Sequence, residues 1–113
     1  MKQSFQIPHR LTALNEYIKA ERGNRYAAAS IKKRETQTCS LYMGKLKPMN
    51  GPIKVTSYWH YKNKARDLDN VAYAKKYFMD SLQKRGIISN DNSNNVIEYH
   101  DYFVHDKEDK VIV

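Results

Sequence analysis

Alternating apolar and polar side chains mark the clearest strand that the sequence predicts. Along residues 53–61, Val55 and Trp59 fall on a mostly apolar face, while Lys54 and His60 fall on a more polar one. A period of two residues indicates a strand that is buried on one side. Shorter apolar runs predict three further strands, at residues 4–7, 96–104 and 111–113.

Helix-forming segments lie between these strands. The predicted helices are a segment that begins near Asn15 and stops at Gly23, a segment over residues 26–42, and a segment from Asp67 or Asp69 to about Arg85. Asparagine or aspartate at the start and glycine after the end are the usual limits of a helix. The order of the elements predicts an α+β fold, in which helices pack on a small mixed β-sheet.

The third predicted helix has two distinct faces. At about 100° per residue, an apolar arc faces the sheet, consisting of Leu68, Val71, Ala72, Phe78, Met79 and Leu82. A narrow stripe on the opposite side carries Asp69, Tyr73, Lys76 and Asp80. This stripe has two interpretations, a solvated face with a Lys76–Asp80 ion pair or a functional surface.

The composition fits a single domain, residues 1–113. Of the 113 residues 41% are hydrophobic, and no apolar run approaches the roughly 20 residues that cross a bilayer. The start of the chain has no apolar stretch long enough for a signal peptide. The single cysteine, Cys39, forms no internal disulfide, and no Cys/His spacing suits zinc. We therefore expect a soluble, cytoplasmic protein with no membrane partner.

The charge is positive and unevenly distributed. The formal net charge is +8, but residues 1–66 carry 14 basic and 3 acidic side chains, whereas residues 67–113 carry 6 basic and 9 acidic ones. A basic half predicts a polyanionic partner. Acids held beside such a surface repel the partner unless a cation neutralises them, so a metal-dependent reaction on nucleic acid is one interpretation. Ordinary solvated acidic faces are the other.

Asp67 and Asp69 bracket the predicted start of the third helix. One aspartate satisfies the need for an N-cap, and two nearby carboxylates repel each other unless a cation lies between them. Oxygen donors of this kind suit Mg²⁺ or Mn²⁺. Asp91 is a candidate third carboxylate, although its segment also reads as a plain Asn/Asp turn. No glycine-rich phosphate loop is present, so a nucleotide cofactor is not expected.

Five segments in chain order carry a family resemblance. They are F-Q-I-P at 5–8, L-N-E-Y at 14–17, K-A-R-D-L-D-N at 64–70, D-S-L at 80–82, and G-I-I at 86–88 followed by Asp91. Together they resemble the RusA family of Holliday junction resolvases over nearly the whole chain. The resemblance implies a homodimeric RusA-like fold and a small Mg²⁺-dependent endodeoxyribonuclease, with Mn²⁺ as a substitute. Such enzymes, typically of phage or prophage origin, resolve four-way DNA junctions by paired symmetric nicks in recombination and repair.

The resemblance also assigns roles to residues. It places the catalytic metal ligands on Asp67, Asp69 and Asp91, and the catalytic helix lysine on Lys76. Two departures matter, because Tyr73 stands where the family lysine is expected, so that Lys75 competes with Lys76, and Asn90 stands where the family often has an acid. The predicted DNA-binding surface consists of Arg10, Arg22, Arg25, Lys32, Lys33, Arg34, Lys62, Lys64 and Arg66.

Two hypotheses follow from this resemblance. The first is a structure-selective nuclease that acts on branched DNA. The alternative is a catalytically inactive junction- or DNA-binding protein of the same fold. A general basic RNA-binding domain is a third, weaker interpretation.

Overall fold

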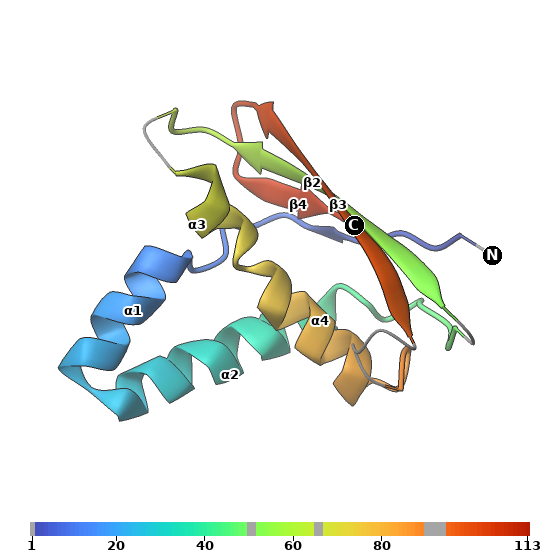
Figure 1. Cartoon of the computed structure of the whole chain (residues 1–113), viewed down its shortest axis with the longest axis horizontal. Coiled ribbons are helices and arrows are strands. Elements are labelled where there is room, and N and C mark those ends of the chain that lie inside the picture. The colour runs from blue at the N-terminus through green and yellow to red at the C-terminus, as the bar shows by residue number, and fades with distance from the viewer. Residues whose placement is uncertain (1, 50–51, 65–66, 90–94) are drawn as a thin grey trace.

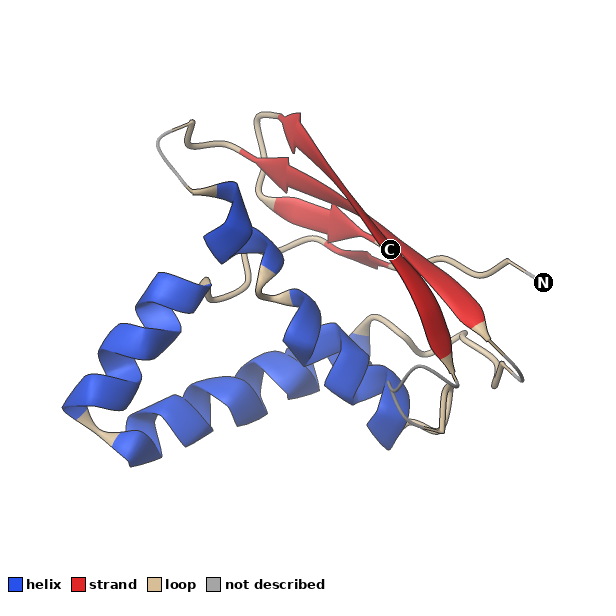
Figure 2. Ribbon diagram, viewed as in Figure 1, coloured by secondary structure: helices blue, strands red, loops and turns tan. Residues whose placement is uncertain are grey.

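The computed structural model describes residues 2–49, 52–64, 67–89 and 95–113. In chain order the elements are β1 (Gln6–Ile7), α1 (Leu14–Gly23), α2 (Arg25–Leu41), β2 (Ile53–Tyr61), α3 (Leu68–Ala72), α4 (Lys75–Lys84), β3 (Val96–His105) and β4 (Lys110–Ile112). The predicted α+β class is confirmed, since the three longer helices α1, α2 and α4 lie on one side of a four-stranded mixed sheet (Figures 1 and 2).

The sheet has the strand order β1-β4-β2-β3. β2 and β3 run parallel, and α3 and α4 form the crossover between them. β4 is antiparallel to both of its neighbours, and it pairs with only three residues of β2, Tyr58 to His60. The other edge of the sheet is β3, whose ladder with β2 spans the full length of β2 with one irregularity near Ile53.

The faces of β2 follow the predicted alternation. Val55, Ser57 and Trp59 are buried, whereas Tyr58 is 43% exposed on the opposite face. The indole of Trp59 stacks on the ring of Phe78 in α4, with 5.9 Å between ring centroids. The hydrophobic core therefore lies between the sheet and the helices, and no helix among the described residues lies on the outer face of the sheet (Figure 1).

The third predicted helix is interrupted. α3 ends at Ala72 and α4 begins at Lys75, so the prediction of one continuous helix was wrong. Around Tyr73 the backbone makes short-range bonds, in which Ala74 N donates to Val71 O and Lys76 N to Tyr73 O. Such i→i+3 bonds tighten a helix locally. The turn coincides with packing of the Tyr73 ring against Tyr17 of α1 and Tyr77 of α4.

The interruption changes which residues are buried. Phe78, Met79 and Leu82 belong to the core as predicted, but Tyr77 and Ser81 are also fully buried. The stripe expected on the opposite side is not simply solvated. Tyr73 packs on the core, and Asp80 is only 19% exposed because α2 lies against α4.

The two N-terminal helices differ in how they begin. α1 starts at Leu14, one residue before the expected Asn15, and the Glu16 carboxylate accepts a hydrogen bond from the backbone N–H of Ala13 at 3.2 Å. α2 is capped by Asn24, whose side-chain oxygen accepts from the N–H of Tyr26 at 2.8 Å. The predicted break at Gly23-Asn24 is thus confirmed, and its asparagine has a definite capping role.

Candidate functional site

Asp67 and Asp69 lie at the start of α3, and both residues are exposed. Asp67 occupies the N-cap position, but its side chain makes no capping bond to the helix backbone. Its carboxylate instead accepts a bond from the side-chain amide of Asn70 at 3.4 Å, and the carboxylate of Asp69 accepts from the Asn70 N–H at 2.9 Å. Asp69 therefore satisfies one first-turn N–H of α3, whereas the Asp67 carboxylate makes no bond to the helix backbone.

The loop before α3 is anchored to the β3–β4 turn. The backbone N–H of Lys62 donates to Asp109 Oδ1 at 2.9 Å, and the Lys62 carbonyl lies 3.1 Å from His105 Nε2. These two contacts fix the backbone at the point where the basic loop leaves β2. Lys62 and Lys64 are exposed and precede the acidic pair by a few residues. The basic residues and the acidic pair thus share the segment that joins β2 to α3 at this end of the sheet (Figure 1).

The predicted third ligand, Asp91, lies outside the described residues, as does Arg66. The residues that bracket it are described: Ser89 Oγ donates to Asn95 Oδ1 at 3.1 Å, and Ile53 N donates to Asn95 O at 2.8 Å. Ser89 and Asn95, the described residues on either side of Asp91, therefore lie near the beginning of β2. Asp67 and Asp69 instead follow the end of β2 (Figure 1). The nine residues of β2 separate these ends by about 27 Å.

No set of three metal-binding side chains is assembled by the part of the chain that the structure describes. Two of the three predicted ligands, Asp67 and Asp69, lie two positions apart at the start of α3. A pair of carboxylates that retains water and phosphate oxygens among the other ligands is a common arrangement for Mg²⁺. The donor set therefore fits a hard divalent cation and offers no soft or imidazole donor.

Lys75 and Lys76 point to different partners. The ammonium of Lys75 donates to Asp101 Oδ2 of β3 at 2.6 Å and lies 4.7 Å from the centroid of the Tyr99 ring. Lys76 lies 3.3 Å from Asp80 Oδ1, as the i,i+4 spacing predicted. Its side chain is 47% exposed, against 21% for Lys75. Lys76 is therefore the lysine of the two that remains accessible to a ligand.

The predicted DNA-binding cations fall into two groups. Three are paired with carboxylates: Arg10 with Glu16, Arg34 with Glu35 at 3.3 Å and Lys32 with Asp80 at 3.9 Å. The hydrogen bond that the Arg10 guanidinium donates to the Glu16 carboxylate is the main cause of the raised pKa of Arg10. Within residues 2–49 and 52–64, five others have no carboxylate within ion-pair distance in the described structure. They are Arg22, Arg25, Lys33, Lys62 and Lys64.

Two acidic residues with defined contacts were not anticipated. Asp101 accepts from Lys75 and also from the indole N–H of Trp59 at 2.8 Å. Glu35 is buried in α2, and its carboxylate accepts from the backbone N–H of Thr12 at 2.7 Å. Neither lies near the start of α3 in sequence, and no motif marks them. Each holds together two elements that are distant along the chain, so we regard both as structural residues.

The surface around α3 offers little enclosed space. A cavity of about 20 Å³ lies between the α3–α4 turn and strands β2 and β4, and Val71, Ala74 and His60 contribute to its wall. Such a volume holds about one water molecule. A large ligand at Asp67 and Asp69 would consequently bind on an open surface, as a nucleic-acid duplex does.

Sequence comparison adds no relative. Neither the models of known protein families nor the curated proteins contain a match to this chain. Among the described residues, no helix combines the length and apolar character needed to cross a membrane. The fold and the side chains described above are therefore the basis for the functional assignment.

Proposed function

We propose that the protein is a Mg²⁺-dependent endonuclease that recognises four-way DNA junctions and cuts them by paired nicks. The observation that carries this proposal is the exposed pair Asp67 and Asp69 at the start of α3, which follows a basic loop and of which Asp67 makes no bond to the helix backbone. The sequence segments that resemble the RusA family support the same activity. The motif R-D-L-D-N is the part of that resemblance that coincides with the exposed pair.

The chemistry divides between the metal and the chain. When bound to these carboxylates, Mg²⁺ supplies an activated water and neutralises charge on the scissile phosphate. Asp67 and Asp69 would hold the cation at the start of α3. Lys62 and Lys64 would bind phosphates beside it, with an affinity that falls as salt rises. Lys76, which lies about two turns further along the chain, would contribute positive charge near the same surface.

The third carboxylate requires a second copy of the chain in this proposal. The residues that bracket Asp91 are about one β2 length away from Asp69. Two residues of extended chain cover only about 7 Å, which is far too short to cross that distance. A two-fold dimer brings unlike ends of two identical chains together. We therefore propose a homodimer in which Asp91 of one copy approaches Asp67 and Asp69 of the other.

One observation favours the alternative function. The ammonium of Lys76, the proposed catalytic lysine, lies 3.3 Å from Asp80 Oδ1 and is therefore already paired with a carboxylate. A junction-binding protein without catalytic activity would need the basic surface but no complete metal site. This alternative keeps the DNA partner and removes the Mg²⁺-dependent step.

A labelled four-way junction separates the two functions. The wild-type protein is expected to nick it symmetrically with Mg²⁺ or Mn²⁺, and Asp69→Asn to bind it as tightly or more tightly without nicking. Glu21→Gln is the matched control, because it also removes one exposed acid from the surface but leaves the proposed ligands intact. Binding without nicks by the wild type supports the alternative, and equal affinity for junction and duplex RNA contradicts both.

A further inference from the structure

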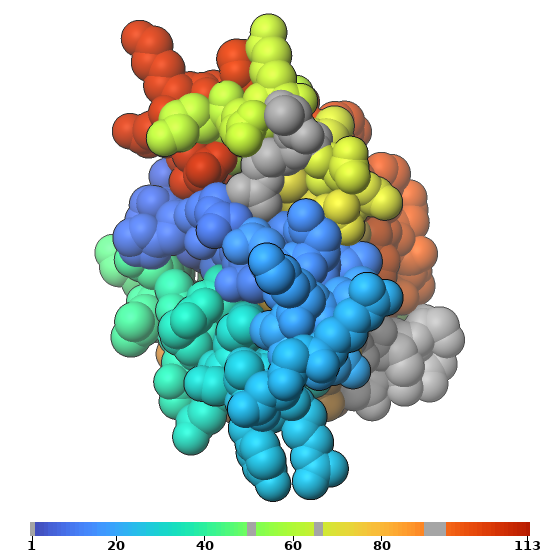
Figure 3. Space-filling view, turned by 90° about the vertical axis from the view of Figure 1, so that its left-hand side faces the viewer, coloured from blue at the N-terminus to red at the C-terminus, as the bar shows by residue number. Residues whose placement is uncertain are grey.

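The turn between α1 and α2 projects from the body of the protein. It forms the end of the helical hairpin in Figure 1 and the light-blue lower end of the surface in Figure 3. Tyr26, at the start of α2, is 71% exposed. The guanidinium of Arg25 lies 5.3 Å from the centroid of its ring. Within the described structure, this is the most exposed aromatic side chain.

The backbone under this side chain is fixed. Asn24 Oδ1 accepts from Tyr26 N, and Asn24 N donates to Ala20 O at 2.8 Å. Two residues further on, Ala28 is buried and packs the first turn of α2 into the protein. The ring is thus held on an ordered helix end. A rigid aromatic group loses little conformational entropy when it binds a flat partner.

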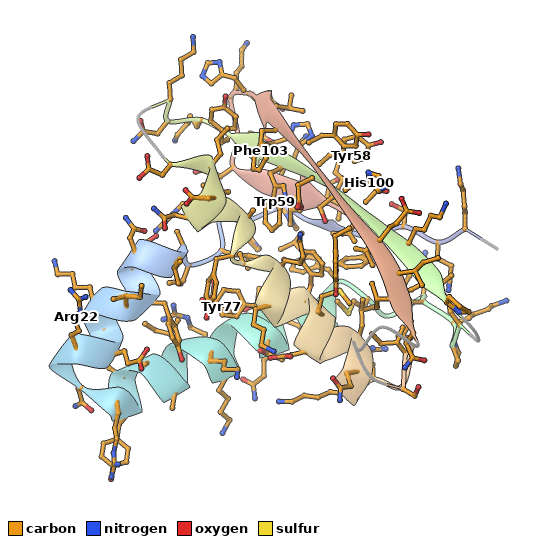
Figure 4. All side chains as sticks on the ribbon, viewed as in Figure 1. Arg22, Tyr58, Trp59, Tyr77, His100 and Phe103 are labelled. Atoms are coloured by element: carbon orange, nitrogen blue, oxygen red, sulfur yellow. The ribbon has the colours of Figure 1, made fainter. Side chains whose placement is uncertain are left out.

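The charge around Tyr26 favours a polyanion. Lys19, Arg22 and Arg25 stand on this turn, and within the described residues none of them is within ion-pair distance of a carboxylate. Figure 4 shows Arg22 at the outer edge of α1. Glu21 is the single acid among residues 19–26. Cations beside an exposed ring are the combination that binds nucleic acid through phosphate contacts and base stacking.

The outer face of the sheet provides a contrast. Tyr58 and Tyr102 are also exposed, but their rings stack on each other at 5.2 Å. On this face Lys54 pairs with Glu98 at 2.9 Å, and His60 Nδ1 lies 2.9 Å from Asp106 Oδ2. Exposure of an aromatic side chain alone therefore does not single out Tyr26. The combination of a free ring face and unpaired cations does.

We propose that Tyr26, supported by Arg25, stacks on a base that is exposed at the branch point of a DNA junction. This inference rests on the proposed function and deepens it. A continuous duplex buries the faces of its base pairs in the helical stack, whereas an opened branch point exposes the terminal base pair of each arm. Base faces are therefore exposed at the branch point and at free duplex ends but not along the interior of a duplex, so the stacking contact contributes to selectivity for the branch point over continuous duplex.

The test measures affinity for a four-way junction and for a linear duplex of matched sequence, without Mg²⁺, so that no cleavage occurs. For Tyr26→Ala we expect about a tenfold loss of junction affinity and an unchanged duplex affinity. Tyr26→Phe keeps the ring and is expected to bind as the wild type does. Tyr102→Ala is the control for loss of an exposed tyrosine and is expected to leave both affinities unchanged.

Three outcomes would overturn the inference while leaving the proposed function intact. They are an unchanged junction affinity for Tyr26→Ala, an equal loss for junction and duplex, and a loss for Tyr26→Phe as large as that for Tyr26→Ala. A wild-type protein that does not prefer the junction contradicts the proposed function itself. The thermal unfolding of each variant is compared with that of the wild type, and Tyr26 is exposed enough that no change is expected.

Discussion

At the residue scale, the contacts between Lys75 and Asp101 indicate that Lys75 has a structural role. Asp101 accepts two hydrogen bonds, from Lys75 and from Trp59, and the Lys75 and Asp101 side chains are only 21% and 24% exposed. The pair joins the start of α4 to β3. Lys75 is therefore engaged in holding the crossover on the sheet, which leaves Lys76 as the lysine that we propose for DNA.

Removing one member of this pair is expected to destabilise the protein. In Lys75→Met the Asp101 carboxylate loses its charged donor while half-buried, which should lower the free energy of unfolding by about 1–3 kcal/mol. Lys76→Met, which breaks a more exposed ion pair, should change it by less than about 1 kcal/mol. Urea unfolding monitored by the fluorescence of Trp59 measures both. Equal effects of the two variants would contradict the structural role of Lys75.

Cys39 is expected to be unreactive in the folded protein. It is fully buried, and burial raises the pKa of its thiol to about 12. In the unfolded chain a thiol ionises near pH 8.5, so the free energy of unfolding should decrease as pH rises from about 8.5 towards 12. Iodoacetamide at pH 8 should modify the native protein at least about tenfold more slowly than the urea-unfolded protein. Similar rates would show that Cys39 is accessible.

Local rules explain which residue contacts could be predicted. The acid at the start of α3 and the break between α1 and α2 depend on neighbours in sequence, and both were predicted from the sequence, although the capping role of Asn24 was not. The Lys75–Asp101 contact joins residues 26 positions apart and has no sequence signal. The hydrogen bond from Thr12 to Glu35 has no sequence signal for the same reason, because the two residues are 23 positions apart. Such contacts are fixed by the packing of elements.

At the element scale, the ends of the third predicted helix were easier to predict than its middle. Gly86 has a φ of +71°, a left-handed conformation that favours glycine, and it follows the end of α4 as expected. No glycine or proline marks the interruption at Tyr73, where packing against Tyr17 and Tyr77 accompanies the turn. The strand β2 was predicted to the residue, because its alternation extends over its whole length.

The conformation of Gly86 gives a direct test of this helix end. Gly86→Ala should lower the free energy of unfolding by about 1 kcal/mol, because a Cβ is unfavourable at this φ. The space around the site is open, so no steric clash adds to the cost. Gly44→Ala is the matched control, since Gly44 also has open space but no left-handed φ. Chemical unfolding of both variants measures the difference, and an equal cost would contradict the explanation.

At the scale of the whole molecule, the proposed ligands Asp67 and Asp69 and the described residues that flank Asp91 lie at opposite ends of β2. The start of α3 holds Asp67 and Asp69, and the beginning of β2 lies beside Asn95. The sequence indicated which acidic residues to consider but not the distance along β2 between them. That distance depends on the path of the α3–α4 crossover, which no local pattern in the sequence indicates. A site shared between two copies of the chain reconciles the separation with the three-acid requirement.

A mixture of two inactive variants tests the shared site. Asp69→Asn and Asp91→Asn are each expected to bind junctions without nicking them. When they are unfolded and refolded together, half of the dimers should be mixed, with one complete site each, which corresponds to about a quarter of the wild-type sites. Single nicks from the mixture, and none from either variant alone, support the shared site. An inactive mixture of correctly dimeric protein contradicts it.

The short pairing of β4 affects how β2 exchanges its amide hydrogens with water. β4 covers only Tyr58 to His60, so among the described residues the first half of β2 has a neighbouring strand on one side only. Successive amides of a strand point to opposite sides, and the N–H of Ile53 points towards β3. The amides of Lys54 and Thr56 therefore point away from β3 and should exchange quickly in deuterated water, while the amides of Val55 and Ser57 remain protected. Fast and slow amides are thus expected to alternate along one strand.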